Sequence, residues 1–404
     1  MSGARAITDR VARVALSRLS EPGDPRLSSL VAELGAARVY TLLLEEQDVA
    51  GVYTDVAARL RGLDPRRELD DAAAAGIRFV CPGDEEWPAQ LADLDRAGQV
   101  PERSGHWQSQ SQSRSQVHGR GGTPLGLWLR GPLRLHEAVA RSVAVVGSRS
   151  ATSYGTSVAA DLSAAVAREG WGVVSGAAFG IDQAAHRAAL AVKGPTVAVL
   201  ACGVDRPYPA AHKQLLDYIA DVGLVASELP PGCAPTRLRF LTRNRLIAAL
   251  TQGTTVVEAA VRSGALSTAN WATRMNRVLM GVPGPVTSAP SQGVHELIRT
   301  RQAALVTRGC DVLELLAPAG SYLAPEARGA EVARDRLGAQ ERQLLEAVPV
   351  VNPAAADSIA RTAALDTATV ERLLPALRER GLVRQVGTRW RLERDVPQRR
   401  SDPA

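Results

Sequence analysis

The chain has 404 residues, of which 45% are hydrophobic and only 4% aromatic, and it carries a formal net charge of +6. This length and composition allow two to three domains whose cores consist mainly of Ala, Val and Leu. The positive charge favours an anionic partner such as nucleic acid, although an overall bias toward arginine would produce the same charge without a functional reason.

Cysteine and histidine spacing gives no metal-binding or disulfide pattern. The cysteines form no C-x-x-C pair, and the histidines show no H-E-x-x-H spacing. This argues against a zinc site and favours a reducing compartment. No apolar run approaches the length of a membrane span, and the first residues are too charged for a signal peptide. We therefore expect a cytoplasmic protein without a metal or cofactor.

Residues 1–75 show apolar residues at helical spacing, notably between Val11 and Leu34. They predict a small helical, SAM-like module that serves either as an interaction domain or as a cap on the core. Residues 76–132 are expected to connect this module to the main domain, with a strand from Gly76 to Cys81 and an extended pattern from Leu125 to Leu129. The Gln-, Ser- and Gly-rich stretch at about 97–123 cannot bury apolar surface, so we expect a disordered insertion there.

Residues 133–317 contain short apolar runs, each followed by a helical pattern. The runs that we interpret as strands are Val143–Val146, Val173–Ser175, Thr196–Ala201, Leu224–Glu228, Thr254–Glu258 and Val278–Val282. This alternation indicates an α/β fold with an extended Rossmann-like parallel sheet and crossover helices. Ligands in such sheets bind beyond the carboxyl ends of the strands, so we expect the functional site at that edge.

The C-terminal part is predicted to form a separate small domain. Residues 318–336 are rich in Ala, Gly and Pro and indicate a linker, whereas residues 394–404 indicate a disordered tail. Between them, residues 337–393 give three helical segments and a hairpin, which is the outline of a winged helix. A protein-binding winged helix with a solvated basic face is as consistent with this pattern as a DNA-binding one. The candidates for secondary DNA contacts are Arg378, Arg384 and Arg389.

Two small-residue loops follow the first two strands of the main domain. They contribute Gly147, Ser148 and Arg149, and then Ser175, Gly176 and Gly180. We expect the first loop at a helix N-terminus, where backbone N–H groups and an arginine together bind an anion. A tight strand-to-helix turn without a ligand is the alternative for this loop taken alone.

A basic segment from Arg237 to Arg245 supplies the second part of the expected site. Basic side chains follow a phosphate backbone, and an aromatic ring offers a nucleobase a stacking surface. We therefore expect Arg237 and Arg243 to face a ligand beside Phe240. The alternatives are a core position for Phe240 and an internal ion pair for Arg245.

No residue set for catalysis emerges from the same edge. His186 follows Asp182 by one helical turn, but no nucleophile or paired carboxylate accompanies it, so we expect a structural histidine. Glu228 and Glu258 end strands and could bind a ribose or a metal. A salt bridge with the segment from Arg243 to Arg245 is the favoured interpretation for both.

These stretches resemble the DNA-processing protein A (DprA/Smf) family. The resemblance is carried by VAVVGSRSATSYG at 143–155, SGAAFGIDQAAHRAAL at 175–190, GVDRPYP at 203–209, RNRLIAAL at 243–250 and residues 256–284. It implies a non-catalytic, cofactor-free homodimer that binds and protects single-stranded DNA and loads RecA recombinase onto it in natural transformation. The family's phosphate-binding turn and its base-and-phosphate segment fall within the complete candidate set, which is Gly147, Ser148, Arg149, Ser175, Gly176, Gly180, Arg237, Phe240, Arg243, Asn244, Ser263 and Gly264.

The chain departs from the family pattern at Phe179, where Arg or Lys is usual, and this removes one expected phosphate contact. An alternative function of a different class is a nucleotide-processing enzyme, such as a nucleoside-monophosphate phosphoribohydrolase. Those enzymes carry a P-G-G-x-G-T-x-x-E motif, and here Thr251-Gln252-Gly253 replaces its first part. A transcription regulator is a third hypothesis, but it leaves the phosphate edge of the main domain unexplained.

Overall fold

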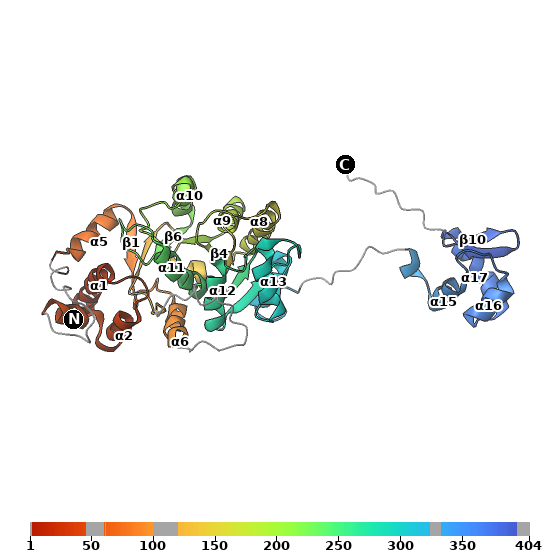
Figure 1. The fold of residues 1–404 in the computed structure, drawn as a ribbon, viewed down its shortest axis with the longest axis horizontal. Helices are drawn as coiled ribbons and strands as arrows, with labels where there is room; N and C mark the ends of the chain where they lie inside the picture. The colour runs from red at the N-terminus through yellow and green to blue at the C-terminus, as the bar shows by residue number, and fades with distance from the viewer. Residues whose placement is uncertain (1, 46–59, 61, 100–119, 324–332, 394–404) are drawn as a thin grey trace. The chain divides into compact units, whose positions relative to one another are not determined.

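The computed structural model describes residues 2–45, 60, 62–99, 120–323 and 333–393. The chain divides into two units, Met1–Ala324 and Pro325–Ala404, and each has its own hydrophobic core (Figure 1). The predicted tail, most of the predicted insertion and about half of the predicted linker lie outside the described residues.

The first unit is built on a nine-stranded sheet with the order β1-β2-β6-β5-β4-β3-β7-β8-β9. The strands are β1 Ile77–Val80, β2 Leu127–Arg130, β3 Ser142–Val146, β4 Gly172–Ser175, β5 Thr196–Val199, β6 Leu224–Ser227, β7 Gly253–Val256, β8 Val278–Gly281 and β9 Ala304–Leu305. From β6 to β9 all neighbouring strands pair in parallel, whereas β1 and β2 pair antiparallel. The predicted α/β fold with a mostly parallel sheet is confirmed.

The sheet begins well before the predicted domain boundary at residue 133. Strand β2 pairs with β6 through Trp128 and Ser227, and β1 pairs with β2 through Phe79 and Trp128. Trp128 is fully buried, and its ring lies 4.9 Å from that of Phe79. Together the two strands cover the edge of β6 that would otherwise be open. The strand and the extended stretch expected in the connecting segment are therefore both strands of the main sheet, which the sequence did not predict.

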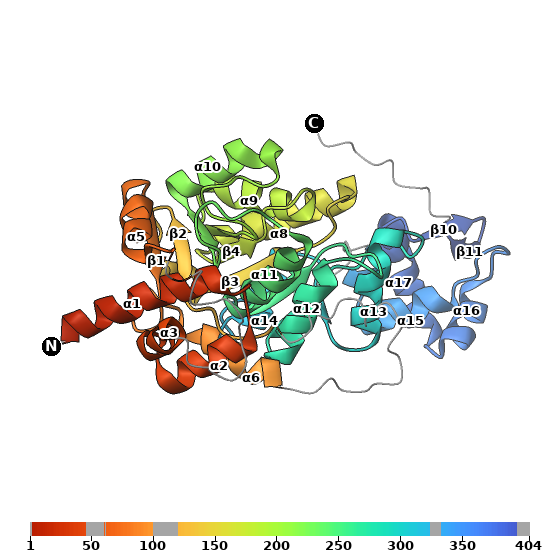
Figure 2. The same cartoon turned by 60° about the vertical axis from the view of Figure 1, so that its left-hand side comes forward.

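Helices cover both faces of the sheet, as Figures 1 and 2 show for α8, α9 and α10 on one side and α6 and α12 on the other. Alternate strand residues point to opposite faces, so Ala144 and Val174 pack with one helix layer and Val143 and Val173 with the other. The first layer holds η1 Ala89–Ala92, α6 Asp93–Gln99, α7 Leu135–Ala140, α11 Arg237–Ala249, α12 Ala265–Arg274 and α13 Gln292–Arg299. The second holds α8 Ser153–Arg168, α9 Ile181–Ala191, α10 Lys213–Val222 and α14 Gly309–Leu316. Two further 3-10 turns are η2 Ala210–His212 and η3 Ala289–Ser291.

The strand order reverses between β3 and β7. Successive strands run outward from β3 to β6 on one side, and the chain then returns to pair β7 on the other side of β3. Such a reversal opens a crevice at the carboxyl ends of the two central strands, where ligands of these sheets bind. Gly147 and Val257 directly follow these two strands, so the predicted edge lies at this reversal.

The N-terminal module is helical, as predicted, and its SAM-like character stays a prediction. Its helices are α1 Ser2–Leu19, α2 Pro25–Leu34, α3 Ala36–Leu44 and α5 Pro65–Ala74. Helix α1 packs against α3 and α5, and the Arg18–Glu68 ion pair of 2.5 Å joins α1 to α5. No single helix among the described residues has the length and apolar character to cross a membrane; only α2 and α3 taken together pass that test, with a bend of 109° between them.

The second unit contains the three helices and the hairpin that the sequence predicts. They are α15 Ala339–Ala347, α16 Ala356–Ala363, α17 Thr367–Glu379, β10 Val383–Val386 and β11 Arg389–Leu392, preceded by the 3-10 turn η4 Ala333–Arg336. Leu344, Ile359, Leu374 and Trp390 form its core. That this unit acts as a winged helix stays a prediction.

Candidate nucleic-acid interface

An arginine and two aromatic rings meet at the carboxyl edge of the sheet. The guanidinium of Arg149, in the loop after β3, lies 4.9 Å from the centroid of the Phe240 ring on α11. The Tyr208 ring, in the loop after β5, lies 5.3 Å from the same ring at an interplanar angle of 49°. The phosphate-binding and base-stacking residues that the sequence predicts separately are therefore in direct contact.

Two more exposed side chains complete this surface. Arg237 precedes Phe240 by one helical turn on α11 and is exposed, and Phe179 projects from the loop before α9 with 45% of its surface exposed. We call the rim the set Arg149, Phe179, Tyr208, Arg237 and Phe240.

The two small-residue loops, which were expected at the same sheet edge, pack against each other. The backbone N–H of Ser148 donates to the Glu258 carbonyl at 2.7 Å, and that of Ile181 donates to the Ser148 carbonyl at 3.3 Å. Gly180 has a φ of +77°, and a Cβ there would lie 2.3 Å from the Ser148 carbonyl oxygen. Only glycine allows this approach, so Gly180 fixes the position of the backbone that carries Arg149.

The expectation that Gly147–Arg149 lies at a helix N-terminus is wrong. Helix α8 begins at Ser153 with Thr152 as its N-cap, and the preceding residues form a loop. The Glu258 carboxylate accepts hydrogen bonds from the Thr152 N–H at 2.9 Å and the Thr152 hydroxyl at 2.5 Å. A Cβ on Gly155 would lie 2.3 Å from the Glu258 carboxyl carbon. The protein's own carboxylate therefore occupies the anion position at this helix end.

A buried polar layer lies under the rim, and Arg243 belongs to it, contrary to the expectation that it faces a ligand. Arg243 is only 6% exposed and donates to the Val199 carbonyl. A Cβ on Gly176 would overlap the Arg243 guanidinium, so the Gly176 backbone packs directly against that guanidinium. Burial lowers the pKa of Arg243 to about 10, and the nearby Asp182 carboxyl opposes this shift. Burial likewise raises the pKa of Asp182, which accepts hydrogen bonds from the loop N–H groups of Gly176 and Ala178.

Ser175 and His186 are also buried in this layer rather than exposed to a ligand. The Ser175 hydroxyl donates to the Val145 carbonyl at 2.6 Å. His186 Nδ1 lies 2.8 Å from the Thr196 hydroxyl, which itself donates to the Val173 carbonyl, so Nδ1–H must be the donor. Burial lowers the pKa of His186 to about 3, and the positive charge of Arg243 adds to the effect. The interpretation of His186 as structural is confirmed.

Two further arginines of the basic segment tie α11 to the N-terminal module. Arg245 is fully buried and pairs with Glu228 at 2.8 Å, which confirms the internal ion pair with Glu228 rather than Glu258. Arg239 pairs with Glu21 at 2.7 Å. The N–H of Gly23 donates to the Glu228 carboxylate at 3.3 Å, so the turn between α1 and α2 is fixed to the same carboxylate.

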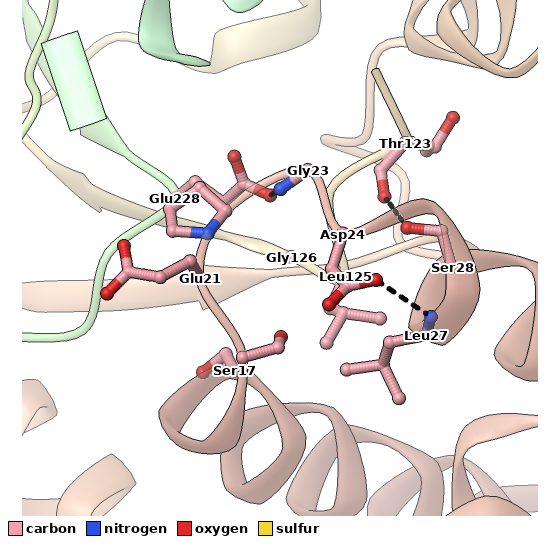
Figure 3. Close-up of a pocket in the computed structure, with 12 residues that line it drawn as sticks. Ser17, Glu21, Gly23, Asp24, Leu27, Ser28, Thr123, Leu125, Gly126 and Glu228 are labelled. Atoms are coloured by element: carbon pink, nitrogen blue, oxygen red, sulfur yellow. Dashed lines mark hydrogen bonds between the residues drawn. The ribbon is translucent and has the colours of Figure 1, made fainter. Parts of the chain in front are cut away.

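Figure 3 shows the small pocket at this junction. Its polar groups bond each other: Asp24 caps α2 through the N–H of Leu27, and the Ser28 hydroxyl donates to the Thr123 carbonyl. A cavity volume of about 20 Å³ holds roughly one water molecule. The pocket is a small gap where the N-terminal module packs against the sheet.

The remaining candidates of the main domain form a junction between α11 and α12. The Asn244 side-chain amide donates to the Gly264 carbonyl at 3.2 Å, and the Ser263 hydroxyl accepts from the Ala265 N–H at 3.3 Å. Asn244 is 9% exposed and Gly264 is exposed. Asn244 therefore fixes the loop that begins α12, and the role of all three in binding stays a prediction.

In the second unit, Arg384 and Arg389 are exposed on the hairpin. Arg378 lies with its guanidinium 6.0 Å from the Trp390 ring and donates to Gln385 at 3.0 Å. Arg378 thus joins the third helix to the hairpin. DNA contact by these three arginines stays a prediction.

Tyr208 is the residue that sequence reasoning missed as a site residue, and Phe179 was noted only as the loss of a basic side chain. Tyr208 follows a strand that ends at the same sheet edge, and this placement is the signal that could have identified it. The chain has only three phenylalanines, so an exposed Phe179 at that edge was also informative.

Comparison with known proteins gives a consistent set of matches. Residues 78–317 match the family model of DNA recombination-mediator protein A. A Mycobacterium tuberculosis protein that carries the DprA name is 43% identical over 387 residues, which cover 94% of this chain and 93% of that protein. Protein Smf of Escherichia coli is 37% identical over 213 residues, covering 50% of this chain and 56% of that protein. The X-ray structure of DprA from Streptococcus pneumoniae matches with a TM-score of 0.60 and 30% identity, covering 77% of this chain and 98% of that chain.

Proposed function

The chain belongs to the DNA recombination-mediator protein A family, and from this premise we propose that it binds single-stranded DNA through the rim. The observation that carries the proposal is the contact of the Arg149 guanidinium with the Phe240 ring beside Tyr208. A cation for phosphate and aromatic surfaces for bases lie at one place on the sheet edge. This combination is typical of sites for single strands, whose bases are free to stack on protein rings.

Binding is expected to tolerate many sequences. Arg149 and Arg237 are exposed at the rim and can neutralise phosphates, which releases counterions from the strand. The aromatic rings stack on any base, because every base has a π-face. Affinity therefore falls with rising salt and depends little on base identity.

The proposal is for a binding protein rather than an enzyme. His186 is buried with a pKa of about 3, so it is not poised to exchange protons near neutral pH. Glu258, at the strand reversal where a nucleotide phosphate would otherwise sit, is engaged by Thr152. Both observations speak against the nucleotide-processing alternative.

The finer role follows family membership. We propose that the chain acts as a cytoplasmic homodimer that protects incoming single strands and loads RecA recombinase onto them in natural transformation or recombination. Its support is the match to the recombination-mediator family and to proteins named for DNA processing. The test is RecA-dependent strand pairing on DNA coated with single-strand-binding protein, with and without this chain; no acceleration by the chain would contradict loading.

The binding proposal is tested by titrating a fluorescent oligothymidine and a duplex of equal length. We expect tighter binding of the single strand, weakened by Arg149→Ala. The matched control is Arg168→Ala, which removes an exposed arginine from the last turn of α8. A parallel assay follows hydrolysis of nucleoside monophosphates. Nucleotide turnover without oligonucleotide binding would replace the proposal with the enzymatic alternative.

A further inference from the structure

Two of the four aromatic side chains that are exposed among the described residues, Phe179 and Tyr208, lie at the rim; the other two are Tyr154 and Tyr218. Phe179 is 45% exposed and Tyr208 is 43% exposed, whereas Phe79 on β1 is 4% exposed. Burying a phenylalanine side chain stabilises a folded protein. Leaving Phe179 in water forgoes that stabilisation, so its exposure calls for an explanation other than core packing.

Phe179 is held in a defined place beside Arg149. It directly precedes Gly180, whose α-carbon packs against the backbone carbonyls of Ser148 and Arg149. Its ring lies 4.4 Å from the His212 ring in an edge-on arrangement of 63°. The His212 ring is itself fixed, because it is buried and its Nδ1 lies 2.9 Å from the Ala177 carbonyl.

Tyr208 stands between Phe240 and the turn that carries His212. Its ring lies 5.3 Å from that of Phe240, and the next residue, Pro209, accepts a hydrogen bond from the His212 N–H at 2.9 Å. Both aromatic side chains are therefore anchored through neighbours and keep their free surfaces toward solvent. Rings fixed in this way lose little conformational entropy when a flat ligand stacks on them.

We propose that Phe179 and Tyr208 are additional base-stacking positions, so that the rim holds several consecutive unstacked nucleobases around Arg149. This inference rests on the proposed function and deepens it. At Phe179 the chain replaces a phosphate contact by a stacking contact. The ligand is a single strand with splayed bases, because the base faces of a duplex are already stacked on each other.

The chemistry of the surroundings favours nucleobases over an apolar peptide. The Arg149 guanidinium lies 4.9 Å from the Phe240 ring, the Tyr208 ring contacts Phe240, and exposed Arg237 lies one helical turn from Phe240. Cations beside aromatic rings match a chain that carries both phosphates and bases. A purely apolar peptide would leave the guanidinium groups without partners.

The test compares an oligothymidine with an abasic strand of equal length and charge, each titrated with wild type, Phe179→Ala and Tyr208→Ala. Stacking on one base predicts roughly 5- to 150-fold weaker oligothymidine binding for each variant. On the abasic strand, wild type and both variants should bind equally. Phe179→Trp and Tyr208→Phe should retain wild-type affinity, since each keeps a ring.

The matched control is Tyr218→Ala on α10, which removes an aromatic side chain that is 52% exposed outside the rim. It should leave both affinities unchanged. Phe179→Arg should restore a charge contact and steepen the salt dependence by roughly 0.7 to 1 in the logarithmic slope.

Three outcomes decide the matter. Equal binding of oligothymidine by wild type and by folded Phe179→Ala and Tyr208→Ala overturns the inference and leaves the proposed function standing. The same holds if the variants weaken abasic and normal strands alike, which would indicate lost shape or a peptide-like surface rather than stacking. No binding of either strand by wild type overturns the proposed function itself.

Discussion

Arginines occur both in the rim and in the buried layer beneath it, but they are exposed in the rim and buried in the layer. Arg149 lies exposed over Phe240, whereas Arg243, on the same helix as Phe240, is 6% exposed and bonded to a backbone carbonyl. Helix α11 contains both situations: Arg237 is exposed at its start and Arg245 is fully buried further along. Depth relative to the sheet edge, and not residue type, separates the exposed arginines that we propose to bind from the buried ones that support them.

The buried layer holds the rim in place. The buried arginines and carboxyls hold α11, the two loops and the N-terminal module in one arrangement, and the rim is presented on top of it. Changes in the buried layer should therefore lower stability, and changes in the rim should lower affinity without lowering stability.

Arg245→Ala should have the largest effect, because it leaves Glu228 buried without its cation. Removing one partner of a buried ion pair costs about 3–5 kcal/mol, and the free energy of unfolding in urea should fall by that amount. Replacing both partners, as in Glu228→Gln with Arg245→Met, should cost less than the single change. A double variant that is no more stable than Arg245→Ala would contradict the ion-pair account.

Because the pKa of His186 is low in the folded protein, we expect the protein to lose stability in acid. Its pKa is about 3 in the folded protein, whereas an unfolded histidine titrates near 6.5, so between these values only the unfolded chain takes up the proton. The free energy of unfolding should therefore decrease as pH falls from about 6.5 toward 3, by at most about 1.4 kcal/mol per pH unit from this group. His186→Asn, whose amide can donate to Thr196 in place of Nδ1, should reduce the slope in urea unfolding measured from pH 7 to 4.5. An unchanged slope would contradict the assignment.

Phe240→Ala should weaken single-strand binding by about 1–3 kcal/mol with little change in melting temperature. The ring is only half-buried and lies under the Arg149 guanidinium, so its loss opens no deep cavity. Leu238→Ala, at an exposed apolar position on the same helix, is the control and should bind normally. A large drop in melting temperature with normal affinity would instead place Phe240 in the core, outside the site.

Arg149→Ala should lower the logarithmic salt slope of binding by roughly 0.7 to 1. Because its guanidinium covers the Phe240 ring, the two substitutions should not add. A double-mutant cycle of oligonucleotide affinities should show a coupling of about 0.5–1 kcal/mol. Strict additivity would mean that Arg149 and Phe240 act on the strand independently.

Removal of the second unit should have the smallest effect. A chain that ends at Leu323 keeps the rim and the core of the first unit. We expect its affinity for oligothymidine to stay within a few-fold of the full chain, measured by the same titration. A folded fragment that no longer binds would move the site to the helices and hairpin that include Arg384 and Arg389.

Much of the fold could be predicted because it depends on local patterns. The six predicted strands from Val143 to Val282 are present, since short apolar runs between helices indicate buried parallel strands. The antiparallel pairing of β1 and β2 onto β6 was missed, because it depends on contacts between segments far apart in sequence. The start of α8 was also misplaced, because Ser148, Ser150 and Thr152 are all acceptable N-cap residues in sequence.

The site was predicted by position more reliably than by exposure. Gly180 lies in the loop before α9 at the expected sheet edge, and its close approach to the Ser148 carbonyl is a feature that only the folded backbone shows. The burial of Arg243 could not be predicted, since α11 carries arginines on all sides and its periodicity shows no polar face. The contact of Arg149 with Phe240 joins the loop after β3 to helix α11 at one sheet edge, and only the folded backbone shows it.

Photo-crosslinking tests the central claim most directly. A 5-iododeoxyuridine oligonucleotide is irradiated with the full chain, and the crosslinked tryptic peptides are identified by mass spectrometry. We predict crosslinks in peptides that contain Phe240, Tyr208 or Phe179, with those at Phe240 lost in Phe240→Ala. Crosslinks confined to residues 333–393, with none at these three rings, would contradict the claim that the rim binds the single strand.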